Sequence, residues 1–265
     1  MSAGRGLVAL LTDFGARDWY VAALKGVILS RAPRARLVDI THEIPPQDIV
    51  AGGFTLAAAA PCFPAGTVFL AVVDPGVGTS RALLAACADG RWFVGPDNGL
   101  LAPILARARS RTVVTLTNRR YWGPSISRTF HGRDIMAPVA AYLARGGALR
   151  RLGPVRSRTA PLPIPSAHAR GGVVTGAVAH IDRFGNLITN LEAARWLGPH
   201  PEGRVRLRYR GRRVAVVSSY ADGRPGRLVA VVGSLGFVEL AVPLGSAAAR
   251  TGARRGDAVE IVQKG

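Results

Sequence analysis

The feature of this chain that most constrains its fold is an alternation of short, continuous apolar runs with helical patterns over the first 74 residues. The apolar runs span residues 7–14, 36–41 and 67–74, and each has the length and composition of a buried strand. Between them, residues 18–33 and 48–60 carry apolar side chains at helical spacing. Such an alternation predicts a β-α-β-α-β unit with a buried sheet.

Local signals extend this pattern toward residue 150. Asp18 is a candidate N-cap for the first helix, and Asp89-Gly90 predicts a hairpin turn between two further strands. A short helix within 100–108, a strand over 112–117 and a helix that stops at Gly146 complete the unit. We therefore predict the α/β class: a mixed sheet with helices on both faces, which binds ligands at the carboxyl ends of its strands.

The pattern changes after residue 154. Residues 155–171 are rich in proline and have little periodicity, which is typical of a linker. From residue 172 to 265, strand follows strand with one short helix near EAARWLG. We predict an N-terminal α/β domain over 1–154, a proline-rich linker over 155–171, and a smaller C-terminal all-β sandwich or barrel over 172–265.

The charge balance of the chain is strongly basic. Lys and Arg number 35 against 16 Asp and Glu, which gives a formal net charge of +19. Such a balance normally suggests nucleic acid or an anionic surface as the partner. However, Lys25 and Lys264 are the only lysines, and the arginines are scattered in short groups without regular aromatic interleaving. This favours a codon-level bias and argues against nucleic acid as the main partner.

Targeting and metal-binding signals are missing from the sequence. No apolar run reaches the ~20 residues that cross a bilayer, and Asp13 interrupts the short apolar stretch near the N-terminus. We expect a cytoplasmic protein with no membrane partner. Cys62 and Cys87 form no CxxC pair and no cluster with histidine, so no metal site is expected.

The residues whose side chains could take part in catalysis or ligand binding lie mostly where loops leave predicted strands. They are Asp13, Asp74, Asp182 and Asn186, together with His131 just before a helix. Each residue alone has a structural alternative as a turn former or a helix cap. Their coincidence at strand ends is stronger evidence, because the carboxyl edge of an α/β sheet offers a binding crevice.

The glycine-rich segment VDPGVG, residues 73–78, does not form a phosphate cradle. It lacks the lysine and the Ser/Thr of a P-loop, and no GxGxxG opens the first helix. Asp13 at a strand end suits a ribose diol, because a carboxylate accepts hydrogen bonds from two neighbouring hydroxyls. The residues therefore permit a nucleoside without a pyrophosphate.

Seven motifs follow one another along the chain: TDFG with Asp18, THEIPP, VDPGVG with Arg81, GPDNG, TFHGRDIMAP, IDRFGN, and GSLGFVELAV with GSAA. In their order and spacing the chain resembles the SAM hydrolase family, also called the SAM hydroxide adenosyltransferases, which are relatives of the fluorinase and the chlorinase. The resemblance covers nearly the whole chain. Because it combines motifs from both predicted domains, it is far more specific than any one motif.

The resemblance implies nucleophilic attack on the ribose C5′ of S-adenosyl-L-methionine (SAM) by water or hydroxide, with adenosine and L-methionine as products. It implies that Asp74, Arg81 and His131 form the catalytic set that positions and activates the water. A sulfonium is already a good leaving group, so neither a general acid nor a cofactor is expected. Either Asp74 or His131 can be the base.

The resemblance also implies roles for residues that bind the substrate. It assigns the ribose hydroxyls to Asp13, the methionine ammonium to Asp182 and the methionine carboxylate to Ser234. The adenine base is assigned to Asn186 at its edge and to Tyr220 and Phe184 at its face. These pairings suit the chemistry of each substrate group.

The chain departs from the family at two positions. Pro243 stands where asparagine is frequent, which puts local adenine contacts in question, and Ala82 stands where a second arginine is frequent. Relatives place the site between the N-terminal domain of one subunit and the β domain of the next. A homotrimer is therefore expected.

Two other functions remain as alternatives. One is a chloride-using adenosyl transferase, but halogenases of the family carry tyrosine where Asp74 and His131 stand, and a carboxylate beside the nucleophile repels a halide. The fluorinase also has a serine at Gly132 and a long inserted loop that this chain lacks. The other alternative is a non-catalytic nucleoside- or RNA-binding protein, whose RNA affinity would fall steeply with salt.

Overall fold

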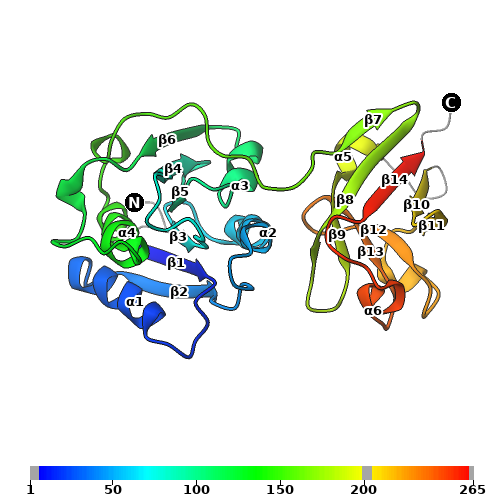
Figure 1. Ribbon diagram of the computed structural model, residues 1–265, viewed down its shortest axis with the longest axis horizontal. Coiled ribbons are helices and arrows are strands. Elements are labelled where there is room, and N and C mark those ends of the chain that lie inside the picture. The colour runs from blue at the N-terminus through cyan, green and yellow to red at the C-terminus, as the bar shows by residue number, and fades with distance from the viewer. Residues whose placement is uncertain (1–5, 199–204, 263–265) are drawn as a thin grey trace. The chain divides into compact units, whose positions relative to one another are not determined.

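The computed structural model describes residues 6–198 and 205–262 (Figure 1). The chain forms two compact units, Met1–Pro163 and Ile164–Gly265. The first is a mixed α/β unit and the second is a β-barrel unit. The predicted fold class is confirmed.

The first unit is built on a six-stranded sheet with the strand order β2-β1-β3-β5-β4-β6. Strand β1 lies parallel to β2 and to β3, and β3 lies parallel to β5, whereas β4 runs antiparallel to β5 and β6. The chain leaves β1 toward β2 on one side and reaches β3 on the other, which makes the carboxyl end of β1 a topological switch point. The strands are β1 (Leu7–Thr12), β2 (Arg36–Thr41), β3 (Val68–Val72), β4 (Leu83–Ala88), β5 (Arg91–Pro96) and β6 (Arg111–Thr115).

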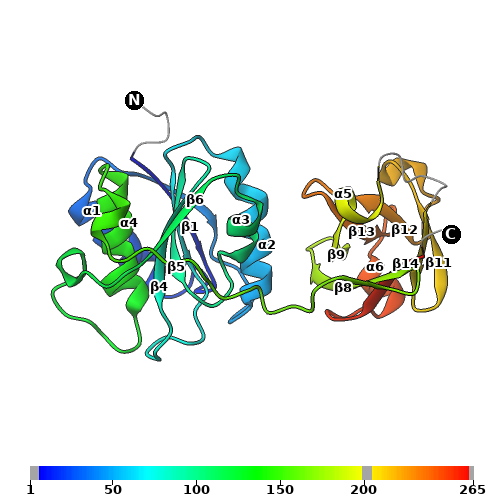
Figure 2. The same cartoon turned by 90° about the horizontal axis from the view of Figure 1, so that it is seen from above.

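Helices cover both faces of this sheet, as predicted (Figure 2). On β1, Val8 and Leu10 point into the core beneath α1 and α4, whereas Ala9 and Leu11 point into the core beneath α2 and α3. This alternation makes the strand apolar throughout, because both of its faces are buried. The helices are α1 (Tyr20–Arg31), α2 (Ile49–Ala59), α3 (Ala102–Arg107) and α4 (Ala137–Ala144), with 3-10 turns η1 (Ala60–Cys62), η2 (Arg119–Tyr121) and η4 (Leu149–Arg151).

The structure tests several local predictions. The hairpin turn is confirmed, since Asp89 and Gly90 have φ values of 46° and 75°. The N-cap at Asp18 is wrong: Trp19 occupies the N-cap position, without a side-chain cap, and packs its ring on Tyr20. Asp18 lies one residue too early to reach the first free backbone N–H groups.

The segment predicted as a linker is divided between the two units. Val155 forms an antiparallel bridge with Val114, and Arg156 pairs with Asp97 at 2.8 Å. Residues 155–163 are thus held on the first unit, and the boundary falls between Pro163 and Ile164.

The second unit is a closed barrel of seven strands. Its sheet has the order β14-β10-β11-β12-β13-β9-β8-β7, and an additional pairing of β14 with β8 closes the ring and leaves β7 outside it. Closure is what distinguishes a barrel from the sandwich that the sequence also allowed. The strands are β7 (His168–Arg170), β8 (Val173–Ile181), β9 (Leu187–Glu192), β10 (Arg206–Tyr209), β11 (Arg212–Val216), β12 (Val229–Val232), β13 (Phe237–Ala241) and β14 (Ala258–Val262).

The described residues of the barrel unit also form short helical segments outside the strands: α5 (Ala193–Trp196), the 3-10 turn η5 (Tyr220–Asp222) and α6 (Ala247–Thr251). The sequence analysis predicted α5, at EAARWLG, but not α6. Its end signals are nevertheless clear: Ser246 accepts a hydrogen bond from the Ala249 N–H at 3.0 Å, and Gly252 ends the helix with φ 62°. Within the described residues of the chain, no helix combines the length and apolar character that crossing a membrane requires.

Candidate active site

The loop after β3 folds an arginine back onto an aspartate. Asp74 follows the end of β3, and a turn closes as the Val77 N–H donates to the Asp74 carbonyl at 3.2 Å. Gly78 has φ 82°, and a Cβ there would lie 2.6 Å from the Arg128 carbonyl oxygen. The glycines of VDPGVG therefore let the loop turn tightly and bring Arg81 back over the strand end.

Asp74 and Arg81 form a bidentate ion pair. The Arg81 Nε donates to Oδ1 of Asp74 at 2.6 Å, and Nη2 donates to Oδ2. The two side chains are only 5% and 9% exposed, respectively. A fork-to-fork pair of this kind fixes both groups in one plane, and because neither charge is well solvated, each depends on the other.

His131 joins this pair through the same guanidinium. Its Nδ1 lies 3.2 Å from Nη2 of Arg81. A guanidinium has no acceptor, so Nδ1 must accept the hydrogen bond and the neutral ring must carry its proton on Nε2. Partial burial, together with the positive charge of Arg81, lowers the pKa of His131 below its ordinary 6.5. The structure therefore brings the three predicted catalytic residues together with a defined tautomer.

A π-helical turn places His131 at the edge of the sheet. This turn, η3 (Gly132–Met136), separates His131 from α4, where the sequence predicted one uninterrupted helix. Gly132, Ile135 and Met136 in the turn are buried. A π-turn inserts an extra residue into the helix and often accompanies a functional site, because it redirects the side chains at that end.

Asp13 lies at the same sheet edge, at the end of the neighbouring strand. It directly follows β1, and β1 pairs in parallel with β3 so that Thr12 stands beside Val72. Its Oδ2 accepts a hydrogen bond from the Gln47 N–H at 2.8 Å. Burial raises the pKa of Asp13, and the negative charge of Asp74 adds to that rise.

A histidine without a predicted role supports the Asp13 loop. His42, from the THEIPP motif, is 8% exposed, and its Nδ1 lies 2.8 Å from the Thr12 hydroxyl oxygen. Its Nε2 lies 3.0 Å from Oδ1 of Asp39, which is within ion-pair distance, but the two atoms do not meet the geometry of a hydrogen bond. The His42 carbonyl also accepts from the Gly15 N–H at 2.7 Å. His42 thus connects the ends of β1 and β2 on both sides of Asp13.

In the barrel unit, Asp182 and Asn186 form one tight loop. Oδ1 of Asp182 accepts from the N–H groups of Phe184 and Asn186 at 2.9 and 2.8 Å, and Oδ2 accepts from the Asn186 side chain at 3.0 Å. Gly185 has φ 81°, and a Cβ there would lie 2.0 Å from the Ser246 hydroxyl. The IDRFGN motif is therefore a loop whose geometry requires glycine and whose carboxylate is held in place.

Tyr220 and Glu239 lie beside this loop. The Tyr220 hydroxyl donates to Oε2 of Glu239 at 3.0 Å. Burial and the charge of Glu239 raise the pKa of Tyr220 to about 12. Burial also raises the pKa of Glu239, which is 7% exposed, and the charge of Asp182 contributes to the rise of both pKa values.

Glu239 is a second residue that the sequence reasoning did not identify. It is the one charged residue of β13, a strand whose five positions are all buried. That contrast was visible in the motif GSLGFVELAV as a lone charge within an apolar run. Its neighbours Asp182 and Tyr220 come from distant parts of the chain, and only the strand order brings them together.

The two remaining predicted site residues lie at the surface of the barrel unit. Ser234 is exposed in the loop between β12 and β13, which is closed by the Gly236 N–H donating to the Gly233 carbonyl at 2.8 Å. Phe184 is 76% exposed. Neither side chain forms a hydrogen bond with another predicted site residue among the described parts of the chain.

Comparison with known proteins decides the family. The model of the SAM hydroxide adenosyltransferase N-terminal domain matches residues 8–153, and the model of the C-terminal domain matches residues 176–260. The chain belongs to the SAM hydroxide adenosyltransferase family. The predicted family is confirmed, and the two domain models fall within the two structural units.

Individual relatives agree with this assignment. The chain is 41% identical to the (R)-S-adenosyl-L-methionine hydrolase of Salinispora tropica, over 96% of this chain and 97% of that protein, and 41% identical to that of Thermus thermophilus, over 96% and 99%. A crystal structure of an uncharacterized conserved protein from Thermotoga maritima aligns with a TM-score of 0.85 at 36% identity, over 97% of this chain and 100% of that one. A fluorinase from Actinoplanes is less similar, at 29% identity over 71% of this chain and 72% of that protein.

Proposed function

We propose that this protein hydrolyses SAM to adenosine and L-methionine. The observation that carries the proposal is the hydrogen-bonded cluster of Asp74, Arg81 and His131 at the carboxyl edge of β3. The names of the full-length relatives at 41% identity support the same reaction.

The chemistry asked of this cluster is modest. A water oxygen attacks C5′ of the ribose, the C5′–S bond breaks, and its electron pair moves to sulfur, which becomes the neutral thioether of methionine. The water loses one proton, so the products are adenosine, L-methionine and a proton. Since the sulfonium leaves without protonation, the protein must mainly orient one water and accept its proton. No cofactor enters the proposed reaction.

The hydrogen bonds around His131 favour Asp74 as the proton acceptor. Nδ1 of His131 accepts from Arg81 and Nε2 carries the ring proton, so His131 is a donor toward the water oxygen. The Asp74 carboxylate keeps free lone pairs after binding Arg81, because each carboxylate oxygen can accept two hydrogen bonds. We propose that His131 holds the water, Asp74 takes its proton, and Arg81 fixes both.

The substrate-binding roles follow the chemistry of the remaining residues. Asp13, at the same edge as Asp74, suits the two ribose hydroxyls. In the barrel unit, the carboxylate of Asp182 suits the methionine ammonium, and the exposed hydroxyl of Ser234 suits the methionine carboxylate. Adenine is assigned to Asn186, Tyr220 and Phe184.

A halide is a poorer nucleophile for this site than water. An anion that approaches this cluster would be repelled by the negative charge of Asp74, whose side chain is only 5% exposed and therefore weakly screened by water. Arg81 cannot offset this repulsion, because its guanidinium is already paired with Asp74. The expected result is therefore hydrolysis rather than formation of 5′-chloro-5′-deoxyadenosine.

The test is turnover of SAM by the purified protein, with products separated by chromatography and identified by mass. Both sulfonium epimers are assayed, because the relatives are named for the (R) form; we expect faster turnover of the (R) epimer. Adenosine and methionine in equal amounts, with or without added chloride, support the proposal. A chlorinated nucleoside, or no turnover of either epimer, overturns it.

The proposed assembly is a homotrimer, and the proposed location is the cytoplasm. Light scattering during gel filtration measures the assembly directly, with three chains of 27.8 kDa expected per particle. A monomer at working concentrations contradicts the trimer without bearing on the reaction.

A further inference from the structure

A pocket lined by arginines lies on the barrel unit and is made from residues that the proposed function does not use. It has a volume of about 620 Å³, within the range of small-molecule sites. Three segments surround it: the β10–β11 hairpin, the residues leading into β12, and the end of α6. The arginines are Arg210, Arg212, Arg213, Arg227 and Arg250, and the other lining residues are Tyr209, Val214, Ala215, Gly226, Leu228 and Thr251.

The charges of this pocket are largely unbalanced. Arg210 pairs with Asp257 at 2.8 Å and donates to the carbonyls of Thr251 and Gly252. The other four arginine side chains have no ion pair or hydrogen bond with any residue that the structure describes, and the pocket lining contains no acidic side chain. Four arginines without a counter-charge from the described chain therefore line one hollow.

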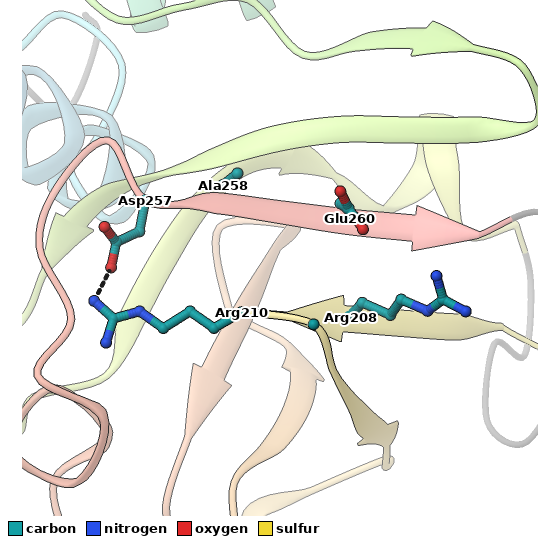
Figure 3. A pocket seen from close by; sticks show the side chains of 6 residues that line it. Arg208, Arg210, Asp257, Ala258 and Glu260 are labelled. Carbon is teal, nitrogen blue, oxygen red and sulfur yellow. Dashed lines mark hydrogen bonds and ion pairs between the residues drawn. The ribbon is translucent and has the colours of Figure 1, made fainter.

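A neighbouring pocket contains acidic side chains beside its arginines. It is smaller, at about 180 Å³, and shares Arg210 with the first pocket. Figure 3 shows Arg210 reaching Asp257, while Arg208 points the other way along the hairpin. Arg208 stands opposite Glu260 in the pairing of β10 with β14. The lining of this smaller pocket thus contains an acidic side chain for each arginine, and of these two pockets only the larger one is lined without acidic side chains.

The backbone fixes the positions from which the four unpaired arginine side chains extend. The hairpin turns tightly at Arg210 and Gly211, with φ values of 49° and 73°. Strand β11 pairs in parallel with β12, and Ala215 stands beside Val229. Arg213 lies two residues before Ala215, and Arg227 lies two residues before Val229. The bonds from Arg210 to the end of α6 anchor Arg250 on the third side.

We propose that this pocket binds a chain of two or three phosphates, either free or as part of a nucleotide. Guanidinium groups bind phosphate oxygens with two parallel hydrogen bonds. The four positive charges exceed the charge of about −2 that a single phosphate group carries near pH 7, so a chain of phosphates balances them better. An extended nucleic acid fits less well, because the arginines surround a hollow rather than a track. The one aromatic residue in the lining, Tyr209, is 3% exposed and offers no face for stacking bases.

The experiment measures binding of inorganic triphosphate and of ATP to the full-length protein by calorimetry, at about 0.15 M salt so that diffuse attraction is screened. The test variant carries Arg213→Ala and Arg227→Ala together. The control carries Arg170→Ala and Arg206→Ala, two exposed arginines of the same unit that do not line the pocket. Thermal unfolding of both variants verifies that they fold.

We expect the test variant to bind triphosphate at least about ten-fold more weakly than the unchanged protein, and the control to differ by less than about two-fold. Equal affinity for triphosphate and ATP identifies the phosphate chain as the ligand, and tighter binding of ATP identifies a nucleotide; both support the site. The Asp74→Asn variant must bind triphosphate as well as the unchanged protein does. Equal weakening in the two double variants, no binding at this salt, or binding of single-stranded RNA alone overturns the proposal.

Discussion

Each of the two units contains a cluster of candidate site residues with at least one acidic side chain, and the clusters differ in how that negative charge is balanced. In the α/β unit, Asp74 is paired at both oxygens by Arg81, which also binds His131. In the barrel unit, Asp182 and Glu239 have no basic side chain within ion-pair distance among the described residues, and Glu239 has only the Tyr220 hydroxyl as a side-chain partner.

In the proposed function, this difference divides binding and catalysis between the two units. A cluster that carries its own counter-charge is organised before any ligand arrives, which suits a group that must act on water. A cluster of carboxylates without a basic partner suits the binding of a cation. SAM has one in its methionine ammonium, so we propose that the barrel cluster binds the substrate and that the α/β cluster carries out the reaction.

The largest expected effect comes from breaking the paired cluster. Replacing Asp74 with Asn removes the proton acceptor and one charge of the ion pair, so we expect kcat to fall by at least ~10². Ser80→Ala, at an exposed position of the same loop, is the matched control and should retain full activity. Steady-state kinetics with SAM measures both, and a kcat of Asp74→Asn within a few-fold of normal would contradict the catalytic role.

Breaking the unpaired cluster should act on substrate binding instead. Asp182→Asn keeps an oxygen for the two backbone hydrogen bonds of the loop but loses the negative charge and the oxygen that accepts from the Asn186 side chain. KM for SAM should therefore rise about ten-fold while kcat changes little. Glu192→Gln removes an exposed carboxylate of the same unit and should leave KM unaltered. If Asp182→Asn lowers kcat alone, the proposed division between binding and catalysis is wrong.

The pH dependence of activity sharpens the role of His131. Its pKa is lowered by burial and by Arg81, while Asp74 and Asp134 act in the opposite direction, so the neutral form persists below pH 6.5. We expect kcat/KM to stay level as pH falls toward 6.5 and to decline by about ten-fold per pH unit only below the lowered pKa. His131→Asn should be slower and lose this acid limb. A decline that begins above pH 6.5 contradicts the neutral tautomer.

The smallest effect concerns stability. The pKa of Glu239 is raised in the folded state, so the folded protein binds this proton more tightly than the unfolded chain does. The free energy of unfolding therefore falls as pH rises from the ordinary pKa of 4.5 to the raised pKa, by about 1.4 kcal/mol for each pH unit of that interval. Glu239→Gln should not show this loss. Urea unfolding across pH 4 to 8 measures the difference, and parallel curves for the two proteins would refute it.

Much of the fold could be predicted from the sequence because its signals are local. Buried parallel strands are continuous apolar runs, and the turn at Asp89-Gly90 has its own residue signature. Features that depend on distant pairing could not be predicted. Barrel closure requires β14 to find β8, across roughly 80 residues that the local pattern does not connect.

The residues of the candidate site also differ in whether local sequence signals could identify them. Strand-end positions alone suggested Asp13, Asp74, His131, Asp182 and Asn186, and the family resemblance added Arg81, Phe184, Tyr220 and Ser234. The supporting residues were missed: His42 acts through Thr12, and Glu239 through Tyr220, and each contact needs the order of strands in the sheet. The π-turn at Gly132–Met136 left no signal in a pattern that also fits an ordinary helix.

The central claim is that Asp74, Arg81 and His131 direct a water molecule onto the carbon that bears the sulfonium. Turnover of SAM in ¹⁸O-labelled water, followed by mass spectrometry of both products, tests it most directly. We predict one ¹⁸O atom in the 5′-hydroxyl of adenosine and none in methionine. Unlabelled adenosine, free adenine, or label recovered in methionine would place the broken bond or the nucleophile elsewhere and contradict the account.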